Sequence, residues 1–156
     1  MLLTTRSAYG VRSLVNLALK YEERMPVSIK EICEAEGLSL VYLEQIFNRL
    51  KHCGIVKSRR GPRGGYMLVR APEDISVYEV VVALEGGIFP GKCVTAKGKK
   101  AVCVNAGTCP SKEVWDEVAR KIKEALEAYS FRDLADKARK IDHGLNEGGV
   151  LCGKFI

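Results

Sequence analysis

Three cysteines stand close together in a segment rich in glycine and lysine. Cys93, Cys103 and Cys109 follow the spacing C-x9-C-x5-C. Nearby ammonium groups lower the pKa of a thiol, and the thiolate is the form that binds iron or zinc. The paired cysteines of a zinc ribbon are missing, and no histidine lies near. The segment therefore holds either three free thiols or three ligands of a metal centre. Its lysines are Lys92, Lys97, Lys99 and Lys100.

Positive charge is concentrated in another part of the chain. The formal net charge is +6, and residues 45–72 contain no Asp or Glu, whereas acids gather at 22–44, 73–85 and 113–147. A basic surface free of acids attracts the phosphates of nucleic acids. A merely solvated surface would show the same run of basic residues. The secondary structure of the segment must therefore distinguish a nucleic-acid-binding surface from an ordinary solvated one. The basic residues are Arg49, Lys51, Lys57, Arg59, Arg60, Arg63 and Arg70.

Two helices are predicted before this basic segment. Residues 2–21 place apolar side chains at helical spacing. Ser28, with Glu31 three positions later, is typical of a capping box, and Gly37 is a natural end for the helix that Ser28 begins. Cys33 falls within this helix and is expected to be a small core side chain.

A third helix, from Ser39 to about His52, has one apolar and one polar face. Tyr42, Gln45 and Arg49 lie at i, i+3 and i+7 and are long polar groups. A helix, a glycine-containing turn and a second helix with a polar outer face are typical of a helix-turn-helix. The predicted inward stripe is Leu43, Ile46, Phe47 and Leu50. Cys53, directly after this helix, is also expected in the core.

A hairpin follows Gly54. Residues 55–57 and 66–70 favour strands, and SRRGPRGGY between them is a Pro- and Gly-rich loop. A basic hairpin directly behind a recognition helix is a wing. We therefore predict a mainly α fold, in which residues 1–85 form a winged helix-turn-helix DNA-binding domain with a two-stranded β-wing.

The predicted DNA contacts come from the third helix and the wing. Gln45 suits an adenine edge and Arg49 a guanine or a phosphate in the major groove. Glu44 can accept from cytosine, and the wing arginines suit the minor groove. The alternative is an ordinary solvated surface. The predicted DNA-binding set is Ser39, Tyr42, Glu44, Gln45, Arg49, Arg59, Arg60, Pro62, Arg63, Gly64, Gly65 and Tyr66.

The remaining chain is predicted in four parts. Residues 76–85 form a helix or a buried strand, and 86–110 form a cysteine-containing sensor loop. Ser111 caps a long helix that, with a following helical turn, spans 111–141. The glycine-rich residues 142–156 are expected to be a flexible tail. The apolar stripe of the long helix is Val114, Trp115, Val118, Ile122, Ala125, Leu126 and Tyr129.

Several classes of protein are excluded by the sequence. The segment GGIFPGKC matches a P-loop only in part, because Cys93 replaces the Ser or Thr that binds magnesium and no helix follows. No other catalytic motif is present, so an enzyme is not expected. No apolar run approaches about 18 residues, which excludes a membrane-spanning helix. The first residues lack a secretory leader, and a cytoplasmic protein is expected.

The chain resembles the Rrf2 family of bacterial winged-helix regulators, of the IscR, NsrR and CymR types. The resemblance covers roughly residues 1–140. It rests on LLTTRSAYGVRSLVNLAL, on YLEQIF followed by SRRGPRGGY, and on the cysteine loop followed by VWDEVARKIKEALEAYSFRDL. It implies a transcriptional regulator, a repressor or an activator, that binds a pseudo-palindromic operator in double-stranded DNA as a homodimer. The long helix then provides the dimer interface, through Trp115, Val118, Ile122 and Leu126.

The resemblance also implies an iron–sulfur cluster, held by Cys93, Cys103 and Cys109, that senses cluster supply, nitric oxide or redox state. We expect [2Fe-2S] ahead of [4Fe-4S]. The first cysteine gap is longer than in the best-known members, and their fourth-ligand positions correspond here to Lys112 and Ala8, so the fourth ligand is unassigned. The alternatives are a cluster-free repressor of the same fold that responds to thiol chemistry or a small molecule, and an iron–sulfur carrier or redox enzyme.

Overall fold

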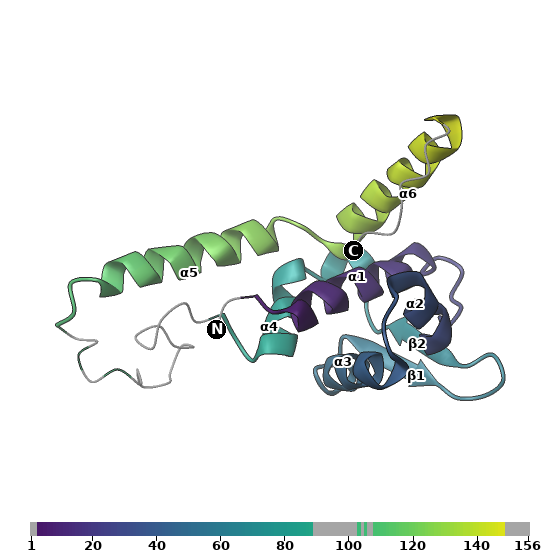
Figure 1. Cartoon of the computed structure of the whole chain (residues 1–156), viewed down its shortest axis with the longest axis horizontal. Helices are drawn as coiled ribbons and strands as arrows, with labels where there is room; N and C mark the ends of the chain where they lie inside the picture. The colour runs from purple at the N-terminus through teal and green to yellow at the C-terminus, as the bar shows by residue number, and fades with distance from the viewer. Residues whose placement is uncertain (1–2, 89–102, 104, 106–107, 149–156) are drawn as a thin grey trace.

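The structure is a computed structural model that describes residues 3–88, 103, 105 and 108–148 (Figure 1). Helices dominate, and the strands β1 and β2 form an antiparallel hairpin, as predicted. In chain order the elements are α1 (Thr5–Leu19), α2 (Ile29–Glu36), α3 (Leu40–His52), β1 (Val56–Arg59), β2 (Gly65–Leu68), the 3-10 turn η1 (Pro72–Asp74), α4 (Val77–Glu85), α5 (Lys112–Glu127) and α6 (Phe131–Gly148).

The ends of α2 follow from local sequence. Ser28 Oγ accepts a hydrogen bond from the Lys30 backbone at 3.2 Å, and Glu31 accepts one from the Ser28 backbone at 3.0 Å. These bonds satisfy backbone N–H groups that the first helical turn leaves unpaired. Gly37 ends the helix in the left-handed conformation, with φ of 66°. The predicted capping box and stop are confirmed.

We expect Ser28→Ala to lower the free energy of unfolding by about 1 kcal/mol, the usual loss when a capping hydroxyl is removed. Urea unfolding followed by circular dichroism measures this difference. Lys30→Ala is the matched control, because Lys30 is exposed on the same helical turn and its backbone, not its side chain, makes the bond. Equal stability of the two variants would contradict the role of the cap.

The core joins α3 to α1 and α4. The four residues of the predicted inward stripe of α3 are all fully buried. They meet Leu14 and Leu17 of α1 and Val80 and Leu84 of α4 in one apolar cluster. A Cβ built on Gly10 would lie 2.2 Å from Leu84 Cδ1, so the glycine lets α1 and α4 approach closely. The α3 surface is therefore held rigidly from behind.

The hairpin has one face on α3 and one face away from it. Ser58 lies opposite Tyr66 and accepts a hydrogen bond from Lys51 of α3 at 3.0 Å. The Tyr66 ring packs on Phe47 with a centroid distance of 4.6 Å. Since side chains alternate along a strand, the neighbouring pair Lys57 and Met67 points away from α3. This second face is called the outer face of the hairpin below.

The hairpin is longer at its tip than the sequence indicates. Ser58, Arg59 and Gly65 belong to strands and not to the predicted loop, and Tyr66 lies in a strand as predicted. At the other end of the hairpin, the strand predictions for Ile55, Val69 and Arg70 are wrong, because the strands span only Val56–Arg59 and Gly65–Leu68. Val27 adds a bridge to the free edge of β2, with both backbone hydrogen bonds to Tyr66 at 2.9 Å. This extra pairing extends the regular structure toward the tip.

The structure of the carboxyl-terminal half decides one open prediction and corrects two others. Residues 77–85 are a helix, which settles the choice between helix and strand. Ser111 precedes α5, but its side chain makes no capping hydrogen bond. Helix α6 continues to Gly148, so residues 142–148 are helical and not part of a loose tail. Residues 149–156 lie outside the described part.

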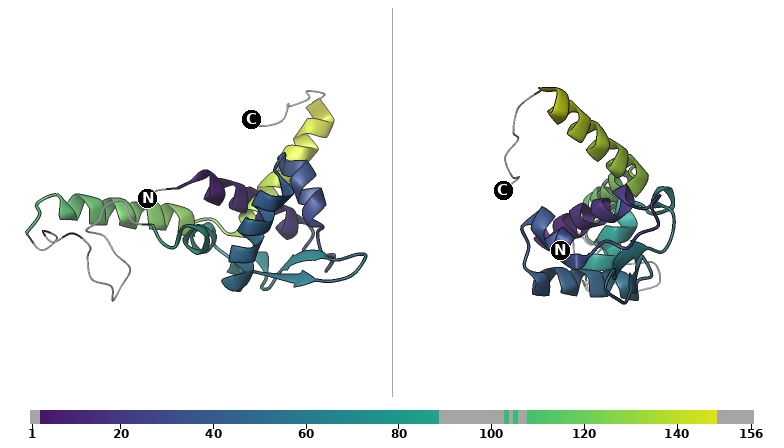
Figure 2. Two further views of the ribbon diagram at one scale, coloured as in Figure 1. Left: turned by 60° about the horizontal axis from the view of Figure 1, so that its bottom comes forward. Right: turned by 90° about the vertical axis from the view of Figure 1, so that its right-hand side faces the viewer.

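Helices α5 and α6 extend away from the winged domain in different directions (Figures 1 and 2). Helix α6 is anchored on α1 through the buried side chains of Phe131 and Ala135, and Arg139 donates to the Leu19 carbonyl at 3.3 Å. Helix α5 has no buried residue. Within the described residues, no helix is both long and apolar enough to span a membrane.

Candidate nucleic-acid interface and cysteine site

The outer face of α3 presents polar side chains to solvent. Gln45 and Glu44 are exposed and make no hydrogen bond or ion pair among the described residues. Ser39 serves as the cap of α3, where its Oγ accepts from the Tyr42 backbone at 3.4 Å. Gln45 and Glu44 are therefore positioned on a rigid helix and available to a partner.

Two other predicted contact residues of α3, Tyr42 and Arg49, also contact neighbouring helices. Tyr42 is half-buried and meets Tyr9 edge-on, with ring centroids 6.2 Å apart. Arg49 donates from Nε to the Ala83 carbonyl of α4 at 3.3 Å. Both side chains link α3 to the helices behind it, which the spacing along α3 alone did not indicate.

The sequence interpretation missed two exposed residues on the same face. Asn48 and His52 follow Gln45 at i+3 and i+7, and all three are exposed. His52 Nδ1 lies 2.6 Å from the Asn48 carbonyl oxygen. Helical spacing taken from Gln45 indicates Asn48 and His52, whereas the same spacing taken from Tyr42 indicates Gln45 and Arg49. The geometry favours 45, 48 and 52 as the centre of the exposed face.

The hairpin projects beyond the helices of the winged domain (Figures 1 and 2), and its tip carries exposed guanidinium groups. Arg59, Arg60 and Arg63 are exposed, as is Pro62. A Cβ on Gly64 would lie 2.5 Å from the Arg59 carbonyl oxygen, so only glycine fits this turn. Gly65 is equally constrained, because its Cβ would lie 2.2 Å from the Val27 carbonyl oxygen. These two predicted contact glycines shape the tip.

The electrostatics of this surface are unbalanced. Among the described residues, no ion pair includes a residue of α3, β1, β2 or the tip between the strands. Tyr66 is half-buried, and burial raises the pKa of its hydroxyl. The arginines therefore keep their charge uncompensated, which suits binding to a polyanion.

Of the three predicted metal ligands, two lie in the described residues. Cys103 and Cys109 are half-buried, and Cys93 lies outside the described part. Cys109 Sγ is 3.1 Å from Ser111 Oγ at the start of α5. Hydrogen bonds from Ser111 and from the backbone of Lys112 lower the pKa of the Cys109 thiol. This environment favours the thiolate that a metal centre requires.

The fourth ligand remains without a candidate in the described residues. No group of three His, Cys, Asp or Glu side chains converges there. Lys112 is paired with Asp116, and Ala8 offers no donor. Of the remaining cysteines, Cys33 is half-buried against the core, whereas Cys53 is exposed, so its predicted core position is wrong. Cys53 follows α3, beyond its inward stripe.

Helix α5 separates apolar from charged side chains. Val118, Ile122 and Leu126 are half-buried, and the last two contact the core. Near the start of the helix, Trp115 is 39% and Val114 58% exposed. The opposite face is charged, with ion pairs such as those of Arg120 with Glu117 and Glu124. The predicted interface residues thus share one incompletely covered face.

Comparisons with known proteins agree with this geometry. A family model named Rrf2 and described as an iron-dependent transcriptional regulator matches residues 3–137. Protein rrf2 of Nitratidesulfovibrio vulgaris is 37% identical over 134 residues, which cover 86% of this chain and 87% of that protein.

Two solved structures are also similar. CymR, described as the global cysteine regulator of B. subtilis, aligns with a TM-score of 0.70 and 32% identity, covering 88% of this chain and 98% of CymR. IscR of T. potens aligns with a TM-score of 0.70 and 35% identity, covering 88% of each chain.

Proposed function

The chain belongs to the Rrf2 family of transcriptional regulators, and we propose that it binds a pseudo-palindromic operator as a homodimer whose DNA affinity responds to an iron–sulfur cluster. As a regulator it is a DNA-binding protein and not an enzyme. The observation that carries the proposal is the pairing of an exposed polar α3 face with uncompensated arginines at the hairpin tip.

The proposed DNA contacts divide by chemistry. Gln45 and Asn48 carry amides that can pair bidentately with an adenine edge in the major groove. Arg59, Arg60 and Arg63 suit phosphates or a narrow minor groove beside it. Tyr42 and Arg49 orient α3 through α1 and α4, and Arg49 retains further N–H groups for a phosphate. In this proposal α3 recognises the base sequence of the operator, and the arginines of the wing supply most of the affinity for DNA.

The proposed dimer interface is the apolar face of α5. Helix α5 has no buried residue, and its Trp115 is exposed. Within one chain its apolar face is therefore left partly in contact with water. A second copy of the chain that covers this face would place two α3 helices on one side of the DNA, as a two-fold operator requires.

The proposed cluster site is the cysteine segment before α5. When bound, the cluster supplies an iron centre that reacts to oxidation, nitric oxide and iron supply. Cys109 fits as a ligand because its thiolate is favoured, and it adjoins α5 directly. Helix α5 packs on the core of the DNA-binding domain through Ile122 and Leu126. The segment after α5 is also tied to the start of α4, because the Val77 backbone donates to the Tyr129 carbonyl at 2.9 Å. A shift of Cys109 can therefore reach α4 and α3.

We expect Gln45→Ala to weaken operator binding by about 1–3 kcal/mol, the usual value of one bidentate base contact. The operator is first selected from random DNA with the anaerobically purified protein. Fluorescence anisotropy then compares the selected duplex with a scrambled one. The scrambled duplex should bind both proteins alike, because phosphate contacts remain.

The matched control is Lys30→Ala on α2, which removes an exposed charge outside this surface. It should leave the selected and the scrambled duplex bound as by the wild type. If Gln45→Ala binds the selected duplex with wild-type affinity, α3 does not read bases through this residue.

A further inference from the structure

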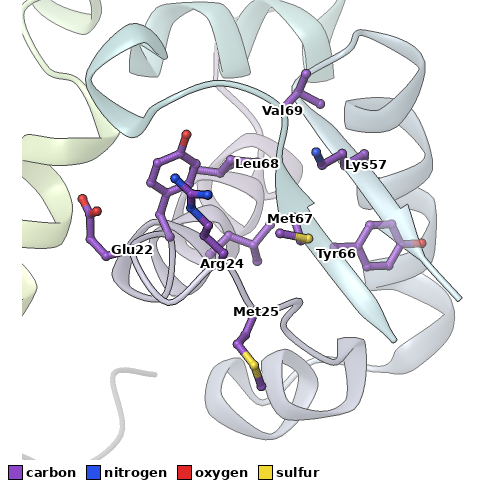
Figure 3. Close-up of a pocket in the computed structure, with 10 residues that line it drawn as sticks. Glu22, Arg24, Met25, Lys57, Tyr66, Met67, Leu68 and Val69 are labelled. Atoms are coloured by element: carbon purple, nitrogen blue, oxygen red, sulfur yellow. The ribbon is translucent and has the colours of Figure 1, made fainter. Parts of the chain in front are cut away.

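A pocket of about 260 Å³ lies between the turn that follows α1 and the outer face of the hairpin (Figure 3). Apart from Tyr66, none of its residues belongs to the proposed DNA or cysteine sites. Because it faces away from α3, a small molecule could enter it without touching the base-reading surface. Two of its lining residues, Arg24 and Lys57, are cations.

Within the part of the chain that the structure describes, neither cation forms an ion pair. Lys57 is exposed and makes no hydrogen bond or ion pair within the described residues, and it points from the hairpin toward the turn that carries Arg24 (Figure 3). Glu22 also lines the pocket, but its carboxylate already binds Arg132 at 2.6 Å, which leaves two cations against one paired acid. The pocket therefore has an excess of positive charge.

The backbone at Arg24 is unusual. Its φ is 52°, and it is the one residue other than glycine with positive φ in the described chain. A side chain with a Cβ adopts this conformation at a cost, and such outliers gather at functional positions. The Arg24 backbone donates to the Tyr21 carbonyl at 3.0 Å, which closes the turn from which the Arg24 side chain lines the pocket.

The rest of the lining is mostly apolar. Leu17 and Leu68 are buried, whereas Met25 and Val69 are 50% and 45% exposed. Methionine adapts its shape to varied apolar groups, and both Met25 and Met67 line the pocket.

We propose that this pocket binds a small amphipathic carboxylate. Arg24 and Lys57 hold the carboxylate, and the apolar part lies against the two methionines and Val69. A guanidinium recognises a carboxylate through two parallel hydrogen bonds, which a neutral alcohol cannot reproduce. The site is separate from the proposed cluster and DNA contacts, so either proposal can fail without the other.

Octanoate is a suitable probe, since it has a single carboxylate and an apolar chain. Titration into full-length ¹⁵N-labelled protein should move the amide signals of residues 21–25 and 66–69 in a saturable way. Octanol has the same chain length without the charge. Its affinity should be lower than that of octanoate by about tenfold or more, the usual loss when a charged hydrogen bond is removed.

Arg24→Asn is the sharpest variant, because asparagine tolerates the left-handed conformation while it removes the charge. It should weaken octanoate binding by about tenfold and leave thermal stability unchanged or higher. Lys57→Gln should weaken binding similarly without affecting the fold, since Lys57 is exposed. Lys30→Asn, which removes a charge elsewhere, should bind octanoate as the wild type does.

Three results would overturn the proposal. One is the absence of saturable shifts at these amides with octanoate. Another is equal affinity for octanol, which would show an apolar cleft without carboxylate recognition. The third is wild-type octanoate affinity in both Arg24→Asn and Lys57→Gln.

Discussion

Cys109→Ser is expected to yield protein without visible absorbance, iron or sulfide after anaerobic purification. Serine lacks the thiolate that iron–sulfur clusters require. The Cys109 sulfur also accepts hydrogen bonds at the start of α5 that favour its charged form. A cluster that loses one of three cysteine ligands should not persist through purification. Ultraviolet–visible spectra with iron and sulfide counts measure the effect.

Cys53→Ser is the matched control, because Cys53 is an exposed thiol at the end of α3, outside the cysteine segment. It should retain the cluster in full. Colour in Cys109→Ser at wild-type strength would show that the ligand assignment is wrong. If the wild type itself contains neither iron nor sulfide but still binds DNA, a cluster-free regulator is the correct interpretation.

Trp115→Glu is expected to convert the proposed dimer to a monomer and to lower operator affinity by about a hundredfold or more, the scale of lost bivalency. Trp115 is 39% exposed on the apolar face of α5, next to Val118 and in line with Ile122. A carboxylate buried in an apolar interface without a partner is strongly unfavourable. Analytical ultracentrifugation measures the oligomeric state, and anisotropy measures the affinity.

Lys121→Gln changes the net charge by the same amount on the charged face of α5, where Lys121 pairs with Glu117 at 3.4 Å. It should remain a dimer with wild-type operator affinity. A dimeric Trp115→Glu protein would place the interface elsewhere. A monomeric wild type would remove the basis for a two-fold operator.

Local sequence determined much of the winged domain. The capping box of Ser28 and Glu31 and the stop at Gly37 depend on hydrogen bonds and backbone conformations within a few residues. The buried stripe from Leu43 to Leu50 depends on helical periodicity alone. The basic hairpin tip was predictable for the same reason, because its charges and glycines are adjacent in the chain.

Tertiary structure decided what each side chain of that domain faces. Tyr42 and Arg49 have the spacing of contact residues, but Tyr9 and the Ala83 carbonyl engage them from distant parts of the chain. Periodicity describes one helix at a time and cannot show which neighbour covers part of its polar face.

The cysteines and the pocket show the same division. Sequence alone identified Cys103 and Cys109 as candidate ligands, because thiol chemistry and spacing are local properties. The pocket is formed when the turn at Arg24 packs beside Lys57 on the hairpin. Its charge and volume depend on two segments brought together by the core, and no short-range pattern contains that information.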